Sequence, residues 1–446
     1  MRQSTILDYN AKDRAVEWCI DIYFDGLNMP PLHCTRANHL IDCDLLEEAC
    51  ADSDSFIGVP SSNEVSFQLF GSRSTFNPTD RNSPYYGKIK AGVPVRIFCR
   101  PIQIADPSDE FNWDPLGTFY ITEWISDLTG VTADVVACDV LYNLFNDEQT
   151  VMNIVPNYTY QDLVTDFFML NGYTPTIVGD LTEVLSFAYI SDTNAKFISD
   201  FSIGALAFVF CNHAGNIIIQ DIDRPAIPEY TLTDNDQVIS VSSKQSAILD
   251  YNGVSLKYNK LQVSDELMLL SNKRQGIGAS STLAFSTQSF SETPVYAISH
   301  ASIKSEANCF VDDVELNPYS VSYVVANASD MPAYFDLTLY GHVIEKLQTT
   351  ISDGMSKELA LESTYIQNEE YAQHIVNLLH KYISLPVPIL ELEVRGNPLI
   401  AIGSVVTVHS AMYNIDFTGI LIRQKFKYDG GMSATMSILS TEIVGA

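Results

Sequence analysis

The sequence predicts a mainly β protein that carries α+β insertions and contains two barrel-like β units. Short segments rich in β-branched and aromatic residues recur at both ends of the chain, with turn residues between them. Between these ends the hydrophobic period lengthens to about 3.6 residues, which is typical of helices. The C-terminal segment alternates like long strands and contains Asp429-Gly430-Gly431, the strongest hairpin signal in the chain.

Residues 1–146 are predicted to form the first β-barrel domain, with a sandwich as the alternative architecture. Turn residues such as Gly26 and Gly130 separate its expected strands. The strands are expected at residues 15–26, 39–45, 64–71, 93–102, 116–127 and 131–140. A short helical turn is expected at residues 46–56.

Residues 147–240 are predicted to form an α+β domain built from helices and a hairpin. Residues 158–173 place Leu163, Phe167 and Leu170 on one face of a helix, which Asn171-Gly172 ends. A second helix is expected at residues 193–206. It leads into a hairpin at residues 208–222 that turns at residues 213–216.

Residues 241–446 are predicted to form the second β-barrel domain. Its strands begin at residues 251–263 and resume at residues 334–352. Between them lies an inserted Ser-rich arm at residues 264–330. The weak pattern of residues 264–308 suggests an exposed arm or insertion rather than a core. The clearest amphipathic helix covers residues 366–384, and the closing strands follow it.

The charge balance is strongly acidic. Lys and Arg total 25 and Asp and Glu total 55, so the formal net charge is −30. Such a chain repels nucleic acid phosphates and anionic membranes, which disfavours a conventional DNA-binding function. Acidic walls would instead suit a conduit through which DNA slides without sticking.

The chain is expected to be soluble and made in a cytoplasm. No secretion signal opens it, and its longest apolar run, residues 203–211, is far too short for a membrane-spanning segment. The cysteines are scattered without a CxxC pair, which indicates reduced, mostly buried thiols. They are Cys19, Cys34, Cys43, Cys50, Cys99, Cys138, Cys211 and Cys309.

No metal or cofactor is assigned from the sequence. The best zinc candidates are soft and borderline ligands close together in the chain, but their spacing fits no standard ligand set. They are His33, Cys34, His39, Cys43 and Cys50. Buried cysteines beside surface histidines are the favoured interpretation. The acidic loops at residues 106–114 and 233–237 lack the alternation of an EF-hand, so calcium is disfavoured.

No catalytic residue is assigned either, and the chain is expected not to be an enzyme. The sequence contains no nucleophile elbow, HExxH helix or cysteine–histidine signature. His374 and His380 lie six residues apart, so they do not share a helix face and are expected to be solvated. Paired acids are too common among 55 to single out a glycosidase pair. Examples are Glu47-Glu48, Asp312-Asp313 and Glu369-Glu370.

The order of several segments resembles the baseplate or tail-tip hub proteins of tailed bacteriophages. The most specific segment is GNP…G…VTV at residues 396–408, followed by a strand that ends in YDGG at residues 428–431. Less specific are GTFYITEW…VVACDVLYNL at residues 117–144 and the hairpin at residues 208–222. YNGVSLKYN at residues 251–259 completes the order.

This resemblance implies a homotrimer in which two barrel domains per chain form a pseudo-hexameric ring. One face of such a ring docks under the tail tube or a distal tail protein ring, and the other carries a spike, fibre or receptor-binding protein. Genomic DNA passes through the ring without specific binding. The protein would be made in the host bacterial cytoplasm and located at the tail tip of the virion.

Two alternatives remain open at the sequence level. One is a carbohydrate-binding or carbohydrate-cleaving receptor-recognition protein of the tail, with Trp113, Tyr85 and Tyr86 as an aromatic platform. The other is a distal tail adaptor ring, for which six copies rather than three are expected.

Overall fold

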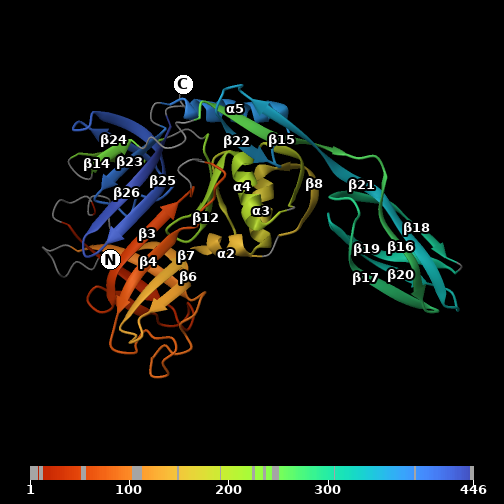
Figure 1. The fold of residues 1–446 in the computed structure, drawn as a ribbon, viewed down its shortest axis with the longest axis horizontal. Coiled ribbons are helices and arrows are strands. Elements are labelled where there is room, and N and C mark those ends of the chain that lie inside the picture. Colours follow the sequence, from red (N-terminus) through yellow and green to blue (C-terminus); the bar gives the residue numbers. More distant parts are fainter. Residues whose placement is uncertain are drawn as a thin grey trace.

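The computed structural model describes residues 9, 14–51, 57–102, 113–147, 150–190, 192–223, 227–234, 238–243, 251–305, 307–385 and 388–441. Figure 1 shows these residues as an arch. The N-terminal strands form one leg, a group of strands from the second half of the chain forms the other, and helices lie between them. The predicted mainly β class is confirmed.

The N-terminal leg is an antiparallel sheet whose strands alternate buried and exposed residues. The strands are β1 (Ala15–Ile22), β2 (Leu32–Thr35), β3 (Leu40–Glu48), β4 (Glu64–Phe70), β5 (Pro94–Ile102), β6 (Asp114–Ser126) and β7 (Thr132–Cys138). The largest fully buried side chain of this leg is Trp18, which stacks on Tyr428 of the C-terminal part.

The helical turn expected at residues 46–56 is wrong for its first part. Leu46, Glu47 and Glu48 continue β3, because they pair with Lys425, Gln424 and Arg423 of a C-terminal strand. Long-range strand pairing thus overrides the helical preference of the local sequence. Residues 52–56 lie outside the described residues.

The C-terminal β unit extends the sheet of the N-terminal leg. Its strands are β13 (Tyr230–Thr233), β14 (Val238–Ser243), β23 (Ile389–Val394), β24 (Val405–Ser410), β25 (Ile415–Tyr428) and β26 (Met432–Ser440). Antiparallel pairing of β25 with β3 joins both groups into one 13-stranded sheet. The predicted hairpin at Asp429-Gly430-Gly431 is confirmed between β25 and β26.

The middle unit packs helices against short strands, and its predicted helices and hairpin are confirmed. Its elements are α2 (Val140–Asn146), β8 (Met152–Thr159), α3 (Tyr160–Leu170), β9 (Thr176–Val178), β10 (Val184–Ile190), α4 (Asn194–Ala205), β11 (Ala207–Cys211) and β12 (Ile217–Asp221). Thr159 and Thr193 begin the two longer helices, since their side chains accept hydrogen bonds from Asp162 N and Lys196 N. Phe167 and Phe197 join these helices with ring centroids 4.2 Å apart.

The second leg, which we call the arm (residues 264–343), is an independent β structure with its own core. The strands of the arm and its base are β15 (Gly253–Val263), β16 (Leu267–Ile277), β17 (Ser281–Ser289), β18 (Val295–Ser305), β19 (Cys309–Leu316), β20 (Ser320–Asn327), β21 (Ala333–Ser352) and β22 (Glu358–Ser363). β21 spans both parts, because its first half pairs with β16 and β18 and its second half pairs with β15.

Residues 264–308 lie in this arm, as their weak pattern suggested, but the expectation that they contribute no core is wrong. These residues form β16, β17 and β18, which pack with β20 and β21 around a hydrophobic cluster. Its buried members include Leu269, Val295, Tyr323, Val325, Phe335, Leu337 and Leu339. The serines and threonines occupy mostly the outward positions of these strands, as in an antiparallel sheet with one solvated face.

The helix expected at residues 366–384 is confirmed as α5 (Glu369–Ile383). The Asn368 side chain accepts a hydrogen bond from Glu370 N at its start. The buried face of α5 packs over β15, at the top of the arch (Figure 1). Within the described residues, no helix is both long enough and apolar enough to cross a bilayer.

Candidate functional site

A buried polar cluster joins three parts of the molecule. Oε1 of Glu47 on β3 lies 2.6 Å from Nε2 of His213. The Glu47 side chain is 2% exposed and the His213 side chain is 15% exposed. The second oxygen of Glu47 accepts a hydrogen bond from Gln424 of β25 at 3.0 Å. His213 belongs to the turn between β11 and β12. The cluster therefore links the N-terminal leg, the middle unit and the C-terminal β unit.

The electrostatics of this cluster favour an ion pair. Burial opposes the charged form of His213, but the charge of Glu47 and the hydrogen bond to it outweigh burial and raise the pKa of the imidazole. Next to Glu47, Glu48 lies 2.7 Å from the guanidinium of Arg423. From the sequence, Glu47-Glu48 could not be distinguished from acid pairs that arise by chance. In the structure, Glu47 contacts His213 and Glu48 contacts Arg423.

The five predicted zinc candidates do not come together. Cys34, Cys43 and Cys50 are buried, and His39 Nδ1 lies 3.0 Å from the backbone oxygen of Phe70. His33 instead lies beside two residues that the sequence did not single out, Cys19 and Asp21. All eight cysteines belong to the described residues, and none of them forms a disulfide.

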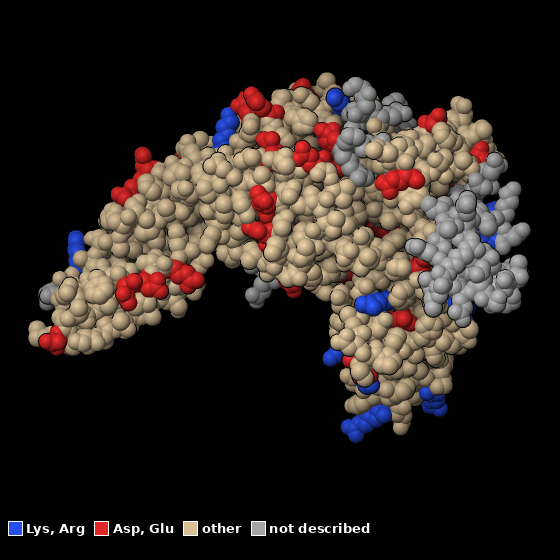
Figure 2. Space-filling model, turned by 180° about the vertical axis from the view of Figure 1, so that it is seen from behind, with Lys and Arg blue, Asp and Glu red and all other residues tan. Residues whose placement is uncertain are grey.

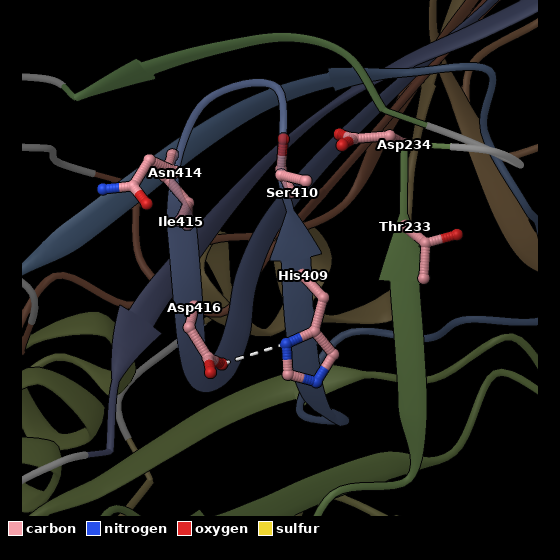
Figure 3. A pocket seen from close by; sticks show the side chains of 8 residues that line it. Thr233, Asp234, His409, Ser410, Asn414, Ile415 and Asp416 are labelled. Atoms are coloured by element: carbon pink, nitrogen blue, oxygen red, sulfur yellow. Dashed lines mark ion pairs between the residues drawn. The ribbon is translucent and has the colours of Figure 1, made fainter.

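A hollow of about 440 Å³ lies where β13, β24 and β25 meet (Figure 3). In it, His409 Nδ1 lies 3.0 Å from Asp416 Oδ1, and the two side chains are 53% and 80% exposed. Ser410 is adjacent to His409 on β24, so its side chain points to the opposite face and cannot serve as a nucleophile activated by this histidine.

The two loops weighed for calcium are described only in part. Asp234 accepts a hydrogen bond from the backbone nitrogen of Met412 at 2.9 Å, and hydrogen bonding lowers its pKa. Asp114 accepts a hydrogen bond from Tyr9 at 2.8 Å. Both carboxylates thus serve internal contacts. Residues 103–112 and 235–237 lie outside the described part of the chain.

The two histidines of α5 lie on different sides of the helix and are each paired with an acid. His380 is one-third exposed and lies 2.7 Å from Asp353, so the expectation of a freely solvated side chain is wrong for it. His374 is half exposed and lies 3.4 Å from Asp223. Neither pair contains a third residue placed as a nucleophile.

The aromatic residues suggested as a carbohydrate platform are mostly engaged in internal packing. Tyr85 stacks on Phe24 with ring centroids 4.5 Å apart. The guanidinium of Arg100 lies 4.4 Å from the ring centre of Trp113. Tyr86 is 48% exposed and is the member of the set that remains available to a ligand.

The arm contains a different aromatic and cationic site. A hollow of about 500 Å³ is lined by Arg274, Lys304 and Tyr334. Arg274 adopts a left-handed backbone conformation in a bulge of β16, and its backbone nitrogen donates to Asp336. Its guanidinium lies 5.7 Å from the ring centre of Tyr334, which is 66% exposed. Sequence reasoning missed this site, because its members come from three different strands.

Charge is unevenly distributed over the surface. In the rear view, Lys and Arg side chains gather at the free end of the N-terminal leg, whereas Asp and Glu side chains lie along the arm and the top of the arch (Figure 2). The loop between β4 and β5 contributes the exposed residues Arg73, Arg81 and Lys90. Because the whole chain has a net charge of −30, these cations distinguish the free end of the N-terminal leg from the rest of the surface.

Comparisons with known proteins find similar structures, but no family model or curated protein whose sequence matches. The 43 kDa tail protein of prophage MuSo2 from Shewanella oneidensis is similar in structure, with a TM-score of 0.54, 12% identity, and coverage of 96% of this chain and 99% of that one. A tail protein from Neisseria meningitidis has a TM-score of 0.53, 10% identity, and coverage of 96% and 98%. The chain therefore has the fold of these tail proteins.

Proposed function

We propose that this chain is a structural tail hub protein of a bacteriophage virion. It joins the hexameric tail tube to the trimeric distal tip or spike. The observation that carries the proposal is the end-to-end likeness to the Shewanella tail protein, which extends over 96% of this chain and so is not confined to one unit. Because the sequence identity to that protein is only 12%, the likeness establishes the fold, and the function is argued from features of this chain.

The finer features of the proposal follow from the arrangement of the chain. Strands β1 to β7 and the C-terminal β unit, to which β13 and β14 already belong, would supply two β units per chain, and three copies would place six β units around one axis. Tail tube or distal tail proteins would bind one face of the ring, and spike, fibre or receptor-binding proteins the other. The net charge of −30 would keep DNA phosphates from lodging on the channel wall. The protein would then reside at the tail tip after synthesis in the bacterial cytoplasm.

The absence of catalytic activity is part of the same proposal. In the described residues, His409 of the hollow beside β24 and both histidines of α5 pair with carboxylates. A structural adaptor requires surfaces and a rigid frame rather than such a site.

The test is the copy number of the purified full-length chain in solution. Light scattering coupled to gel filtration should give three times the mass of one chain, and electron micrographs should show rings. A strict monomer at high concentration without rings would overturn the proposal. Six copies would favour a distal tail adaptor ring.

The hollow on the arm favours one further candidate, a carbohydrate-binding receptor-recognition role. An exposed tyrosine beside two cations suits a sugar ring that carries an acidic group. Binding to a glycan array that is lost in Tyr334→Ala and kept in Tyr86→Ala would support it. Release of reducing sugar would instead indicate carbohydrate cleavage.

A further inference from the structure

Three side chains with the chemistry of metal ligands meet on the first two strands. Cys19 and Asp21 lie two residues apart on β1, so they point to the same face, opposite to the core residues Trp18 and Ile20. His33 of β2 is the direct cross-strand partner of Asp21. Among the described residues, this is the one group of three such ligand atoms that lie within 4.8 Å of one another.

The distances show that the three groups converge. The Cys19 sulfur lies 3.1 Å from His33 Nδ1 and 3.4 Å from Asp21 Oδ1. Asp21 Oδ1 lies 2.8 Å from the same His33 nitrogen. The corresponding separations between ligands around a tetrahedral zinc ion are about 3.3 to 3.6 Å. Small side-chain rotations would therefore open the cluster enough to enclose the ion.

The same geometry argues against a catalytic cysteine. In a nucleophile–base–orienter arrangement, the thiol and the carboxylate contact different nitrogens of the imidazole. Here Cys19 and Asp21 both approach Nδ1 most closely.

We propose that Cys19, Asp21 and His33 form a zinc site, with water as the fourth ligand. Thiolate, imidazole and carboxylate are the groups that zinc prefers. On binding, the ion displaces the thiol proton of Cys19 to solvent. Nδ1 of His33, which faces both other ligands, gives up its hydrogen bond to Asp21, so that the neutral imidazole carries its proton on Nε2. The thiolate and the carboxylate together then balance the charge of the ion.

The surroundings suit a bound ion. Cys19 is 1% exposed and the Asp21 side chain is 15% exposed, whereas the His33 side chain is 50% exposed and leaves a path for entry. Trp113 covers His33 edge-on, with ring centroids 6.0 Å apart. Apolar cover and a fixed imidazole orientation both favour metal binding.

The ion would hold the edge of the large sheet. β2 has four residues and pairs only with β1 along the described sheet order, so it forms one end of that sheet. A metal bridge between β1 and β2 would tie down this short edge strand and limit its pairing with other chains. Such a role is independent of the copy number of the protein.

Cobalt(II) binding to the purified full-length chain tests the site. The unaltered protein should bind one Co²⁺ per chain and show the near-ultraviolet charge-transfer band of a cobalt–thiolate bond, which zinc abolishes by displacement. Cys19→Ser should lose this band. His33→Gln, at a half-exposed position, should weaken Co²⁺ binding by at least about tenfold, because one of three protein ligands is lost.

Cys309→Ser is the matched control. Cys309 belongs to the arm, is more exposed than Cys19 and is not part of the described group of three ligand atoms. This variant should keep the band, and zinc should raise its melting temperature as much as that of the unaltered protein. Absence of the band in the unaltered protein, its persistence in Cys19→Ser, or its loss in Cys309→Ser would overturn the proposal.

Discussion

Two of the buried acidic residues, Glu47 and Asp139, lie where separate units meet. Glu47, His213 and Gln424 join three units in one cluster. Asp139 lies at a second junction, where its carboxylate accepts hydrogen bonds from the backbone nitrogens of Asn63 and Leu141. Each junction replaces apolar packing with directional contacts, which fix the relative orientation of the units more strictly than apolar contacts would.

Removing the histidine from the first junction should destabilise the fold. His213→Ala leaves the carboxylate of Glu47 buried without its cationic partner, so we expect a loss of about 3 kcal/mol in the free energy of unfolding. Urea unfolding measures this loss. The double variant Glu47→Gln, His213→Ala should recover part of it, since the unpaired charge is gone.

The same pair should make stability depend on pH. The pKa of His213 is raised in the folded state, so its contribution is complete below the ordinary value of 6.5 and is lost as pH rises through the raised value. The urea midpoint of the unaltered protein should fall across this interval relative to that of His213→Ala. Parallel curves for the two proteins would contradict the ion pair.

Asp139 should contribute in a different pH interval. Burial raises its pKa to about 6, against the opposing hydrogen bonds from Asn63 and Leu141. Because the folded state holds this proton more tightly, the stability contribution is complete below the ordinary value of 3.8 and is lost as pH rises through about 6. Asp139→Asn should flatten the urea midpoint over this interval, whereas Asp80→Asn at an exposed turn should not.

From the sequence, His33 is a zinc candidate only together with its neighbours in the chain, and buried cysteines beside surface histidines are the favoured interpretation. Cys34 does lie in the core. The residues that do approach His33 are Cys19 and Asp21, across a strand pair. The sequence shows that Cys19 and Asp21 are two residues apart on one expected strand. It does not show the strand register that places His33 opposite Asp21.

At the level of elements, helices were predicted best because their signals are local. In α3 and α5, the apolar residues of the buried face lie within the helix itself, and the N-capping residue directly precedes it. The sequence did not show that the arm has its own core. Its serines obscure the alternation of buried and exposed residues, and β20 and β21, which cover the inner face, lie far along the chain from β16.

Gly341 should be essential to the arm. It lies on β21 between β16 and β18, and a Cβ atom there would meet the backbone oxygen of Ala297 at 2.1 Å. Gly341→Ala should therefore force the strands apart and destabilise the arm by about 1–3 kcal/mol. Hydrogen exchange should show faster exchange in β18 and little change in α3.

Gly276→Ala provides the matched control on the same sheet. A Cβ atom at this position would meet only the ring of Tyr334, at an ordinary contact distance of 3.5 Å. Exchange in the arm should then stay near that of the unaltered protein. Equal effects of the two substitutions would show that the close approach at Gly341 is not what matters.

At the level of the whole molecule, the arm should be removable. Val263 of β15 pairs with Ile344 of β21, so the two strands are already adjacent at the base of the arm. Replacing residues 265–342 with an Asn-Gly turn should leave a hairpin in place of the arm. Because the arm has its own hydrophobic cluster, the remaining body should keep a cooperative thermal transition.

This deletion also separates assembly from folding. If the body forms the proposed ring, the shortened protein should keep the copy number of the full chain in light scattering. A folded monomer would assign the subunit contacts to the arm. An insoluble or unfolded product would contradict the independence of the arm.

The pairing of β25 with β3 sets the order of events during synthesis. Cys43 pairs with Tyr428, so β3 has β4 as its only neighbour in the described sheet order until residue 428 has left the ribosome. Until then the nascent N-terminal strands expose an unpaired edge of hydrogen-bonding groups. We expect a long translational interval in which chaperone binding protects this edge, and ribosome-bound chains truncated before β25 should be more sensitive to aggregation than the released protein.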